Sequence, residues 1–79
     1  MTTIDARGLS CPMPLVMTKV EMEKLSPGQE VVVMATDPEA ALDLAAWAAD
    51  EGHAFAERAS SGWSEFVLRK SRGRSVSRP

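Results

Sequence analysis

The chain alternates between segments of helical and of strand character, and this alternation restricts the folds open to it more than any other feature. Residues 12–24 have the apolar spacing of a helix, as do those that follow Asp37, and each segment has a proline in its first turn, where the missing amide hydrogen costs nothing. Four short segments have strand composition: residues 3–6, 30–35, 53–59 and 64–70. Gly52 lies where the second helix should end, and Gly62 lies in the turn between the last two strands. The predicted order of elements is therefore β-α-β-α-β-β.

This order predicts the architecture. Right-handed crossovers place both helices on one face of a four-stranded mixed sheet. We therefore expect an α+β fold, a two-layer sandwich of βαβαββ order, in one domain that covers residues 1–70. Residues 69–79 carry five Lys or Arg and no acid, with little apolar content. We expect residues 71–79 to form a disordered basic tail.

Composition excludes several classes of protein. In 79 residues there are one cysteine and one histidine, so we expect no internal disulfide, no metal site and no cofactor. No apolar run approaches the roughly 20 residues that span a bilayer, and the first residues lack the pattern of a signal peptide. The basic tail has no aromatic residue for stacking on a base, so direct nucleic-acid binding is not expected. We expect a cytoplasmic monomer without membrane insertion.

Cys11 is the candidate nucleophile. Proline disfavours the α conformation in the residue before it, so Pro12 suits Cys11 to the N-cap position of the first helix. Pro12 is then expected at the first helical position and Pro14 at the third, and the Met13 amide becomes the nearest free donor to the sulfur. The positive end of the helix should stabilise the thiolate. We predict a thiol pKa below about 7.5.

The two helical segments differ in their apolar faces. The second has one face, which suffices for packing on a sheet: Ala41, Leu44, Ala45 and Ala48. The first has two faces, and one of them would contact the sheet: Leu15, Thr18, Met22 and Leu25. The other starts beside the cysteine and would be an exposed contact surface, unless the helix is buried more widely than assumed: Met13, Val16, Met17 and Val20.

Motifs along most of the chain resemble one family. They are Asp5-Ala6-Arg7-Gly8-Leu9, Cys11-Pro12-Met13-Pro14-Leu15, Lys19, Leu25, Pro27-Gly28, Asp37-Pro38, Trp47, Gly52-His53 and Arg69-Lys70. Together they resemble the TusA-like (SirA-type) sulfur-carrier proteins, which have a CPxP motif, over about residues 3–70. The resemblance implies a two-layer βαβαββ sandwich, in agreement with the fold expected from the pattern. It also implies that Cys11 carries sulfane sulfur as a persulfide and hands it to another protein.

The resemblance further implies partners and a docking surface. The partners are a sulfur donor, such as a cysteine desulfurase or a rhodanese, and a sulfur acceptor protein. The residues carried over to partner binding are Met13, Val16, Met17, Lys19 and Asp37, while Pro12 and Pro14 are structural parts of the motif. One departure is Leu42, because some members that relay sulfur to transfer-RNA thiolation have an arginine there. The pathway therefore stays open among transfer-RNA thiolation, sulfur oxidation, cofactor sulfuration and thiosulfate uptake.

Two further side chains are candidates around the thiol. Arg7 lies in the loop before Cys11 and either steadies the sulfur anion or is a surface charge. His53 is the lone histidine and stands far along the chain. We favour a structural or surface role for His53 over an acid-base partnership with Cys11.

The residues leave two alternatives to a sulfur carrier open. A cysteine of low pKa would equally serve a thiol-redox or regulatory module that forms mixed disulfides. The exposed face of the first helix would serve a pure interaction domain in which the cysteine is incidental. With one thiol and no evident pocket, whether the protein counts as a sulfurtransferase enzyme is left open.

Overall fold

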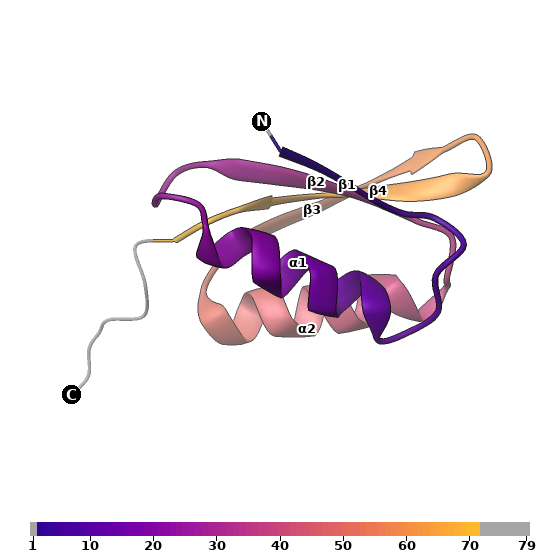
Figure 1. Cartoon of the computed structure of the whole chain (residues 1–79), viewed down its shortest axis with the longest axis horizontal. Coiled ribbons are helices and arrows are strands. Elements are labelled where there is room, and N and C mark those ends of the chain that lie inside the picture. The colour runs from indigo at the N-terminus through magenta and orange to yellow at the C-terminus, as the bar shows by residue number, and fades with distance from the viewer. Residues whose placement is uncertain (1, 72–79) are drawn as a thin grey trace.

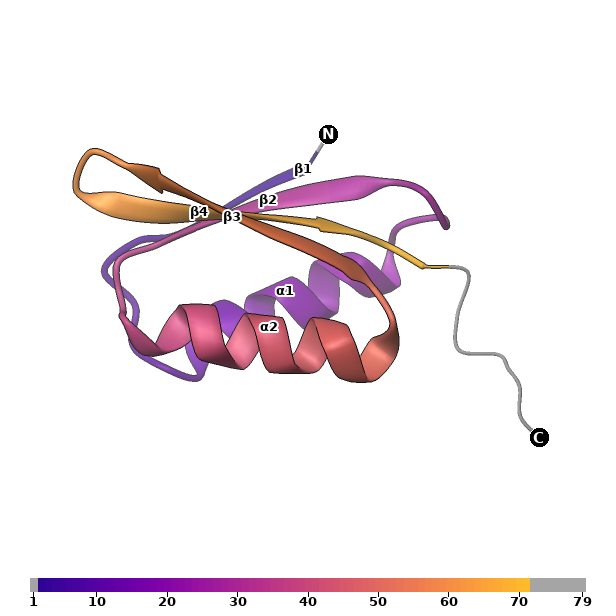
Figure 2. The ribbon, with the colours of Figure 1, turned by 180° about the vertical axis from the view of Figure 1, so that it is seen from behind.

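The computed structural model describes residues 2–71 and contains six elements in the predicted order. They are β1 (Thr2–Ala6), α1 (Met13–Glu23), β2 (Glu30–Ala35), α2 (Glu39–Glu51), β3 (Ala54–Ser60) and β4 (Trp63–Arg69). Both helices lie on one face of the sheet, as Figure 1 and the reverse view in Figure 2 show. The predicted two-layer α+β sandwich is therefore confirmed. The predicted disordered tail falls, apart from Ser71, outside the described residues.

The topology of the sheet determines which loops meet. The strand order is β1-β2-β4-β3, in which β1 is parallel to β2 and the other pairs are antiparallel. Because β1 and β2 are parallel, both end at the same edge of the sheet, and both helices begin there (Figure 1). The loop that contains Cys11 therefore lies beside the loop that contains Asp37.

The core lies between the sheet and the two helices. The buried apolar residues of the sheet are Ile4, Ala6, Val31, Val33, Ala35, Phe66 and Leu68. They alternate with more exposed residues because successive side chains of a strand point to opposite faces. The rings of Phe55 and Phe66 stack with centroids 5.8 Å apart, which extends the core toward β3.

The helix α2 packs through small residues. Ala40, Leu44 and Ala48 are buried, whereas Ala41 is half-buried. The predicted face was therefore right at Leu44 and Ala48. Ala41 packs against the core from its margin, and Ala40, which was not predicted, is fully buried. The helix ends at Gly52, whose φ of 80° is the left-handed conformation that glycine adopts without strain, as predicted.

The helix α1 is shorter than predicted, since it starts at Met13 and ends at Glu23. Thr18 and Met22 are buried as expected, and Pro14 is buried as well. The Thr18 hydroxyl donates to the Pro14 carbonyl at 2.8 Å, which satisfies a buried polar group within the helix. At the other end, the Lys70 ammonium donates to the carbonyls of Met22 and Leu25 at 2.8 and 2.9 Å. These contacts join α1 to the end of β4.

The last two strands form a tighter hairpin than predicted. Ser60 pairs with Trp63, so that the turn consists of Ser61 and Gly62 alone. Gly62 has a φ of 88°, which explains the glycine at this position. Trp63 therefore belongs to β4 and not to the turn.

Candidate thiol site

Cys11 lies in the loop between β1 and α1, and it is exposed. Two hydrogen bonds hold this loop against the loop that precedes α2. The Gly8 amide donates to the Thr36 hydroxyl at 2.9 Å, and the Cys11 amide donates to the Asp37 carboxylate at 2.6 Å. The backbone that leads to Cys11 is therefore attached to the loop that precedes α2.

The local geometry differs from the predicted N-cap. Pro12, not Cys11, occupies the N-cap position of α1, and no side chain caps the helix. The Met13 amide donates to the Ser10 carbonyl at 2.8 Å, so it is not directed at the sulfur. The peptide bond between Cys11 and Pro12 is cis. Cys11 thus stands one residue farther from the helix than predicted.

The closest polar partner of the sulfur is an acid. The Cys11 thiol donates to Asp43 Oδ2, with 2.7 Å between Sγ and the oxygen. This bond, together with desolvation and the negative charges of Asp43, Asp37 and Glu39, raises the pKa of Cys11 to about 11. A carboxylate accepts a hydrogen bond from a thiol but repels a thiolate. The predicted pKa below about 7.5 is therefore wrong for this arrangement.

Asp37 is the best-connected side chain near the thiol. Its Oδ1 accepts from the Glu39 amide at 2.8 Å, while its Oδ2 accepts from the Cys11 amide. The two amide donors lower the pKa of Asp37, because they stabilise the carboxylate. Pro38 occupies the N-cap position of α2, so Asp37 binds the helix start from one residue before it. It links the thiol loop to α2.

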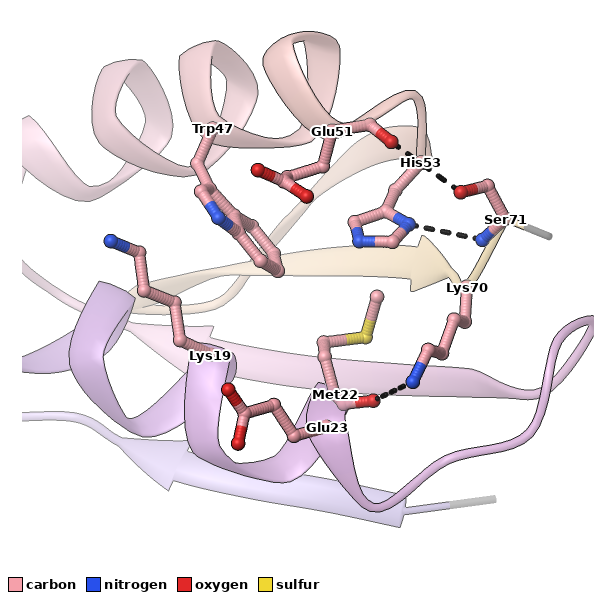
Figure 3. A pocket seen from close by; sticks show the side chains of 8 residues that line it. All are labelled: Lys19, Met22, Glu23, Trp47, Glu51, His53, Lys70 and Ser71. Carbon is pink, nitrogen blue, oxygen red and sulfur yellow. Dashed lines mark hydrogen bonds between the residues drawn. The ribbon is translucent and has the colours of Figure 1, made fainter. Parts of the chain in front are cut away.

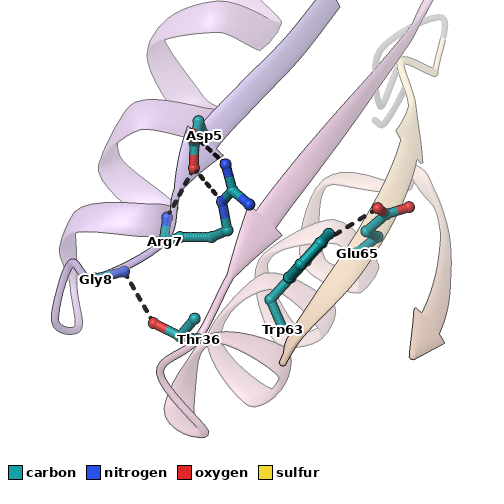
Figure 4. A network of polar contacts seen from close by, with 6 residues as sticks. All are labelled: Asp5, Arg7, Gly8, Thr36, Trp63 and Glu65. Carbon is teal, nitrogen blue, oxygen red and sulfur yellow. Dashed lines mark hydrogen bonds and ion pairs between the residues drawn. The ribbon is translucent and has the colours of Figure 1, made fainter. Parts of the chain in front are cut away.

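Arg7 lies near this edge but contacts other groups. Its guanidinium makes two bonds to the Asp5 carboxylate, of 2.8 and 2.9 Å, and lies 4.8 Å from the centre of the Trp63 ring. The Trp63 indole N–H donates to Glu65 at 3.2 Å (Figure 4). The pKa of Asp5 is lowered to about 2 by the bond from Arg7. Arg7 thus connects β1 with the hairpin, and a role beside the sulfur stays a prediction.

The outward side of α1 exposes apolar residues, as predicted. Met13, Val16 and Val20 are 44%, 42% and 51% exposed. Met17 differs from the prediction, because it is half-buried and packs against the core. A hollow of about 370 Å³ separates this side of α1 from β1, which is an edge strand, and Val16, Met17 and Val20 line it. We call Met13, Val16 and Val20 the outer apolar face.

Lys19 and His53 lie away from the thiol, toward the ends of the helices. They line a hollow of about 300 Å³, shown in Figure 3, together with Met22, Glu23, Trp47, Glu51, Lys70 and Ser71. The His53 ring lies 5.0 Å from the Trp47 ring, and its Nδ1 accepts from the Ser71 amide at 3.0 Å. Desolvation lowers the pKa of His53. The structural role favoured for His53 agrees with these contacts. Lys19 lines this hollow, while Val16, one turn before it on α1, lines the hollow beside β1.

Asp43, which touches the sulfur, was not among the residues predicted from the sequence. It lies in the second turn of α2, 32 residues from Cys11. The parallel order of β1 and β2 was available as a signal, because it brings the first turns of both helices to one edge. The acids at the start of α2 could therefore have been placed beside the thiol.

Two other kinds of site are absent from residues 2–71. None of the helices there is long and apolar enough to cross a membrane. In the same range, no group of three or more His, Cys, Asp and Glu side chains is arranged to hold a metal ion.

The fold and the site define a small two-layer α+β domain that presents a single thiol at the edge where two parallel strands end. Residues 2–70 match the family model described as Sulfurtransferase TusA. The chain belongs to the TusA family.

Individual relatives agree with this assignment. Over 59 residues the chain is 48% identical to YrkI of Bacillus subtilis (strain 168). The matched stretch covers 75% of this chain and 79% of that protein. It is 36% identical over 69 residues to the sulfur carrier protein TusA of Allochromatium vinosum, and this match covers 86% of this chain and 91% of that protein. The crystal structure of a SirA-like protein from Desulfitobacterium hafniense superposes with a TM-score of 0.82 at 26% identity, and the match covers 90% of this chain and 99% of that one. Two other curated relatives are longer, and the chain spans 28% and 26% of their lengths.

Proposed function

We propose that this protein is a sulfur carrier that accepts sulfane sulfur on Cys11 as a persulfide and transfers it to a partner protein. The observation that carries the proposal is the exposed thiol of Cys11, held by two loops at one edge of a TusA-family domain. Exposure is needed because donor and acceptor must both reach the sulfur.

The chemistry requires a single thiol and two partners. The Cys11 thiolate attacks the outer sulfur of a donor persulfide, a new sulfur–sulfur bond forms at Cys11, and the donor leaves with the electron pair of its broken bond as a thiolate. No other cysteine exists in the sequence, so the bound sulfur cannot be expelled by an internal disulfide. It leaves when the thiolate of an acceptor attacks it in turn.

The proposed partners are a cysteine desulfurase or a rhodanese as donor and a second protein as acceptor. The outer apolar face and Asp37 are proposed to contact them. The outer apolar face supports this role because it is exposed and adjoins the thiol loop. Leu42 is 69% exposed on α2, so a partner that requires a positive charge there would not recognise this chain. A cytoplasmic location stays a prediction.

The proposal is tested by intact mass. The reduced protein is incubated with a cysteine desulfurase and cysteine, or with a rhodanese and thiosulfate, beside the Cys11→Ser variant. We expect a gain of one sulfur, about 32 Da, that dithiothreitol removes and that the serine variant never shows. If no donor produces the gain while oxidised glutathione readily forms a mixed disulfide with Cys11 and releases reduced glutathione, the protein is a thiol-redox module instead.

A further inference from the structure

The contact between Cys11 and Asp43 determines which form of the sulfur the free protein contains. The sulfur and the carboxylate oxygen are 2.7 Å apart, and a carboxylate only accepts hydrogen bonds. The proton of this bond must therefore stay on the sulfur or pass to the oxygen. Two anions at this distance would repel each other.

The proton belongs on the sulfur. A carboxyl group ordinarily has a pKa of about 3.9 and a thiol one of about 8.5, so transfer from the thiol to the carboxylate is unfavourable by more than four orders of magnitude. The other charged groups that act on Cys11 have the same sign, since Asp37 and Glu39 also raise its pKa. The nearest cation in the sequence, Arg7, is bonded to Asp5. Asp43 therefore stabilises the thiol and does not activate it.

The contact is held in place from two sides. Asp43 is half-buried and adjoins Leu44, which is fully buried and anchors α2 to the sheet. The Cys11 backbone is attached to the same helix start through Asp37. One bond thus positions the backbone of Cys11, and a second fixes its side chain.

We propose that Asp43 restrains Cys11 as an unreactive thiol in the free carrier, so that sulfur is accepted only after a docked donor separates or neutralises the carboxylate. This inference rests on the proposed function. In the accepting step the thiol proton passes to the departing donor thiolate, the sulfur–sulfur bond of the donor breaks, and the new bond forms at Cys11, with no net oxidation. Before loading, the restraint would slow exchange of Cys11 with small disulfides such as oxidised glutathione, in which Cys11 forms a mixed disulfide and reduced glutathione leaves.

The experiment measures alkylation of Cys11 by iodoacetamide as a function of pH in the wild type, Asp43→Asn and Asp43→Ala. The amide of Asn accepts the same hydrogen bond without the charge, whereas Ala removes both. Asp50→Asn, an exposed change on the same helix, is the matched control. Circular dichroism establishes that each variant is folded.

We expect Asp43→Asn to alkylate about tenfold faster than the wild type at pH 7.5. A return of the thiol pKa from about 11 to the usual range raises the thiolate fraction about a hundredfold. The less basic thiolate is a weaker nucleophile, which lowers the rate per thiolate about tenfold, so the net rate rises about tenfold. The apparent pKa in the rate profile should fall, while Asp50→Asn should follow the wild type. Equal rates, or slower alkylation of Asp43→Asn, would overturn the restraint, and slower alkylation would make Asp43 a general base.

Sulfur loading of the same variants separates this inference from the proposed function. With a low-molecular-weight persulfide as donor, Asp43→Asn should load about tenfold faster than the wild type, and with a cysteine desulfurase the two rates should be similar. Loading in every variant with unchanged alkylation would retain the carrier and reject the restraint. Faster alkylation without any persulfide would retain the restraint and reject the carrier. If Asp43→Asn accelerated loading equally from the low-molecular-weight persulfide and from the desulfurase, docking of the protein donor would not release the thiol from Asp43.

Discussion

The two helices begin side by side at one edge of the sheet, but their first turns have opposite character. At the start of α1 stand Pro12 and Pro14, with no side-chain cap and no acid. At the start of α2 stand Asp37 and Glu39, and the Asp37 carboxylate binds amides of both segments. The thiol at the start of α1 therefore responds to the acids near the start of α2 more than to the dipole of its own helix.

The helices also differ in how they use their apolar residues. Those fully buried on α2 are Ala40, Leu44 and Ala48, which occupy one face against the sheet. The helix α1 buries Met22 in the core and turns Met13, Val16 and Val20 outward. We therefore regard α2 as the support that orients the site and α1 as the element that presents it.

The largest expected effect comes from removing the anchor of α2. Leu44→Ala deletes a side chain with no exposed surface, and loss of its transfer free energy plus the cavity should lower the free energy of unfolding by about 2–5 kcal/mol. Leu42→Ala, two residues away on the exposed side, should change it by less than about 0.5 kcal/mol. Urea denaturation measures both. Similar midpoints for the two variants would contradict the support role of α2.

Removal of the link between the helices should have the next largest effect. Asp37→Ala deletes two hydrogen bonds to backbone amides and should lower the urea midpoint of unfolding, by less than Leu44→Ala does. Asp37→Asn retains one acceptor oxygen and should lose less stability than Asp37→Ala. Amide hydrogen exchange at Cys11 and Glu39 should accelerate in the alanine variant. Unchanged exchange at Cys11 would show that Asp37 does not hold the thiol loop.

A charge on the outer apolar face should affect transfer more than folding. Val16 is 42% exposed, so Val16→Asp should change the free energy of unfolding by about 1 kcal/mol or less. Sulfur transfer from a protein donor should nevertheless slow about tenfold, because a charge is desolvated on docking. Ala46→Asp places the same charge on an exposed position of α2 and serves as the control. Equal transfer by both variants would remove this face from the docking surface.

The smallest expected change in stability comes from His53, which lines the hollow at the end of the domain away from the thiol. The pKa of His53 is lowered in the folded state, so the unfolded chain binds a proton more readily. Stability is then full above the unfolded pKa of about 6.5 and decreases as the pH falls below it. The free energy of unfolding should therefore fall less between pH 7 and 5 in His53→Gln than in the wild type. Parallel profiles would contradict the lowered pKa.

Local patterns predicted most of the fold. The bounds of β2, the end of α2 at Gly52 and the exposure of Met13, Val16 and Val20 all depend on residue spacing or on turn chemistry within a few positions. Such patterns could not predict the half-burial of Met17, because it depends on how closely α1 approaches β1.

The protonation of the thiol was not predictable in the same way. The sequence around Cys11 suggested a thiolate, because the prolines next to it indicate a helix start and the positive end of a helix stabilises an anion. The structure brings Asp43 to the sulfur from 32 residues away. Electrostatic effects of this kind depend on tertiary distances, so a local motif predicts where the reactive atom is better than it predicts its charge.

The position of β4 has a consequence for biosynthesis. Among the elements of residues 2–71 this strand is made last, yet it lies between β2 and β3 in the sheet. β2 can pair earlier with β1, but its other edge and the whole of β3 lack a partner until β4 has left the ribosome, and Phe66 and Leu68 reach the core only then. The growing chain therefore exposes unpaired strand edges until synthesis of the domain is nearly complete, and folding should follow release of the whole domain in one step.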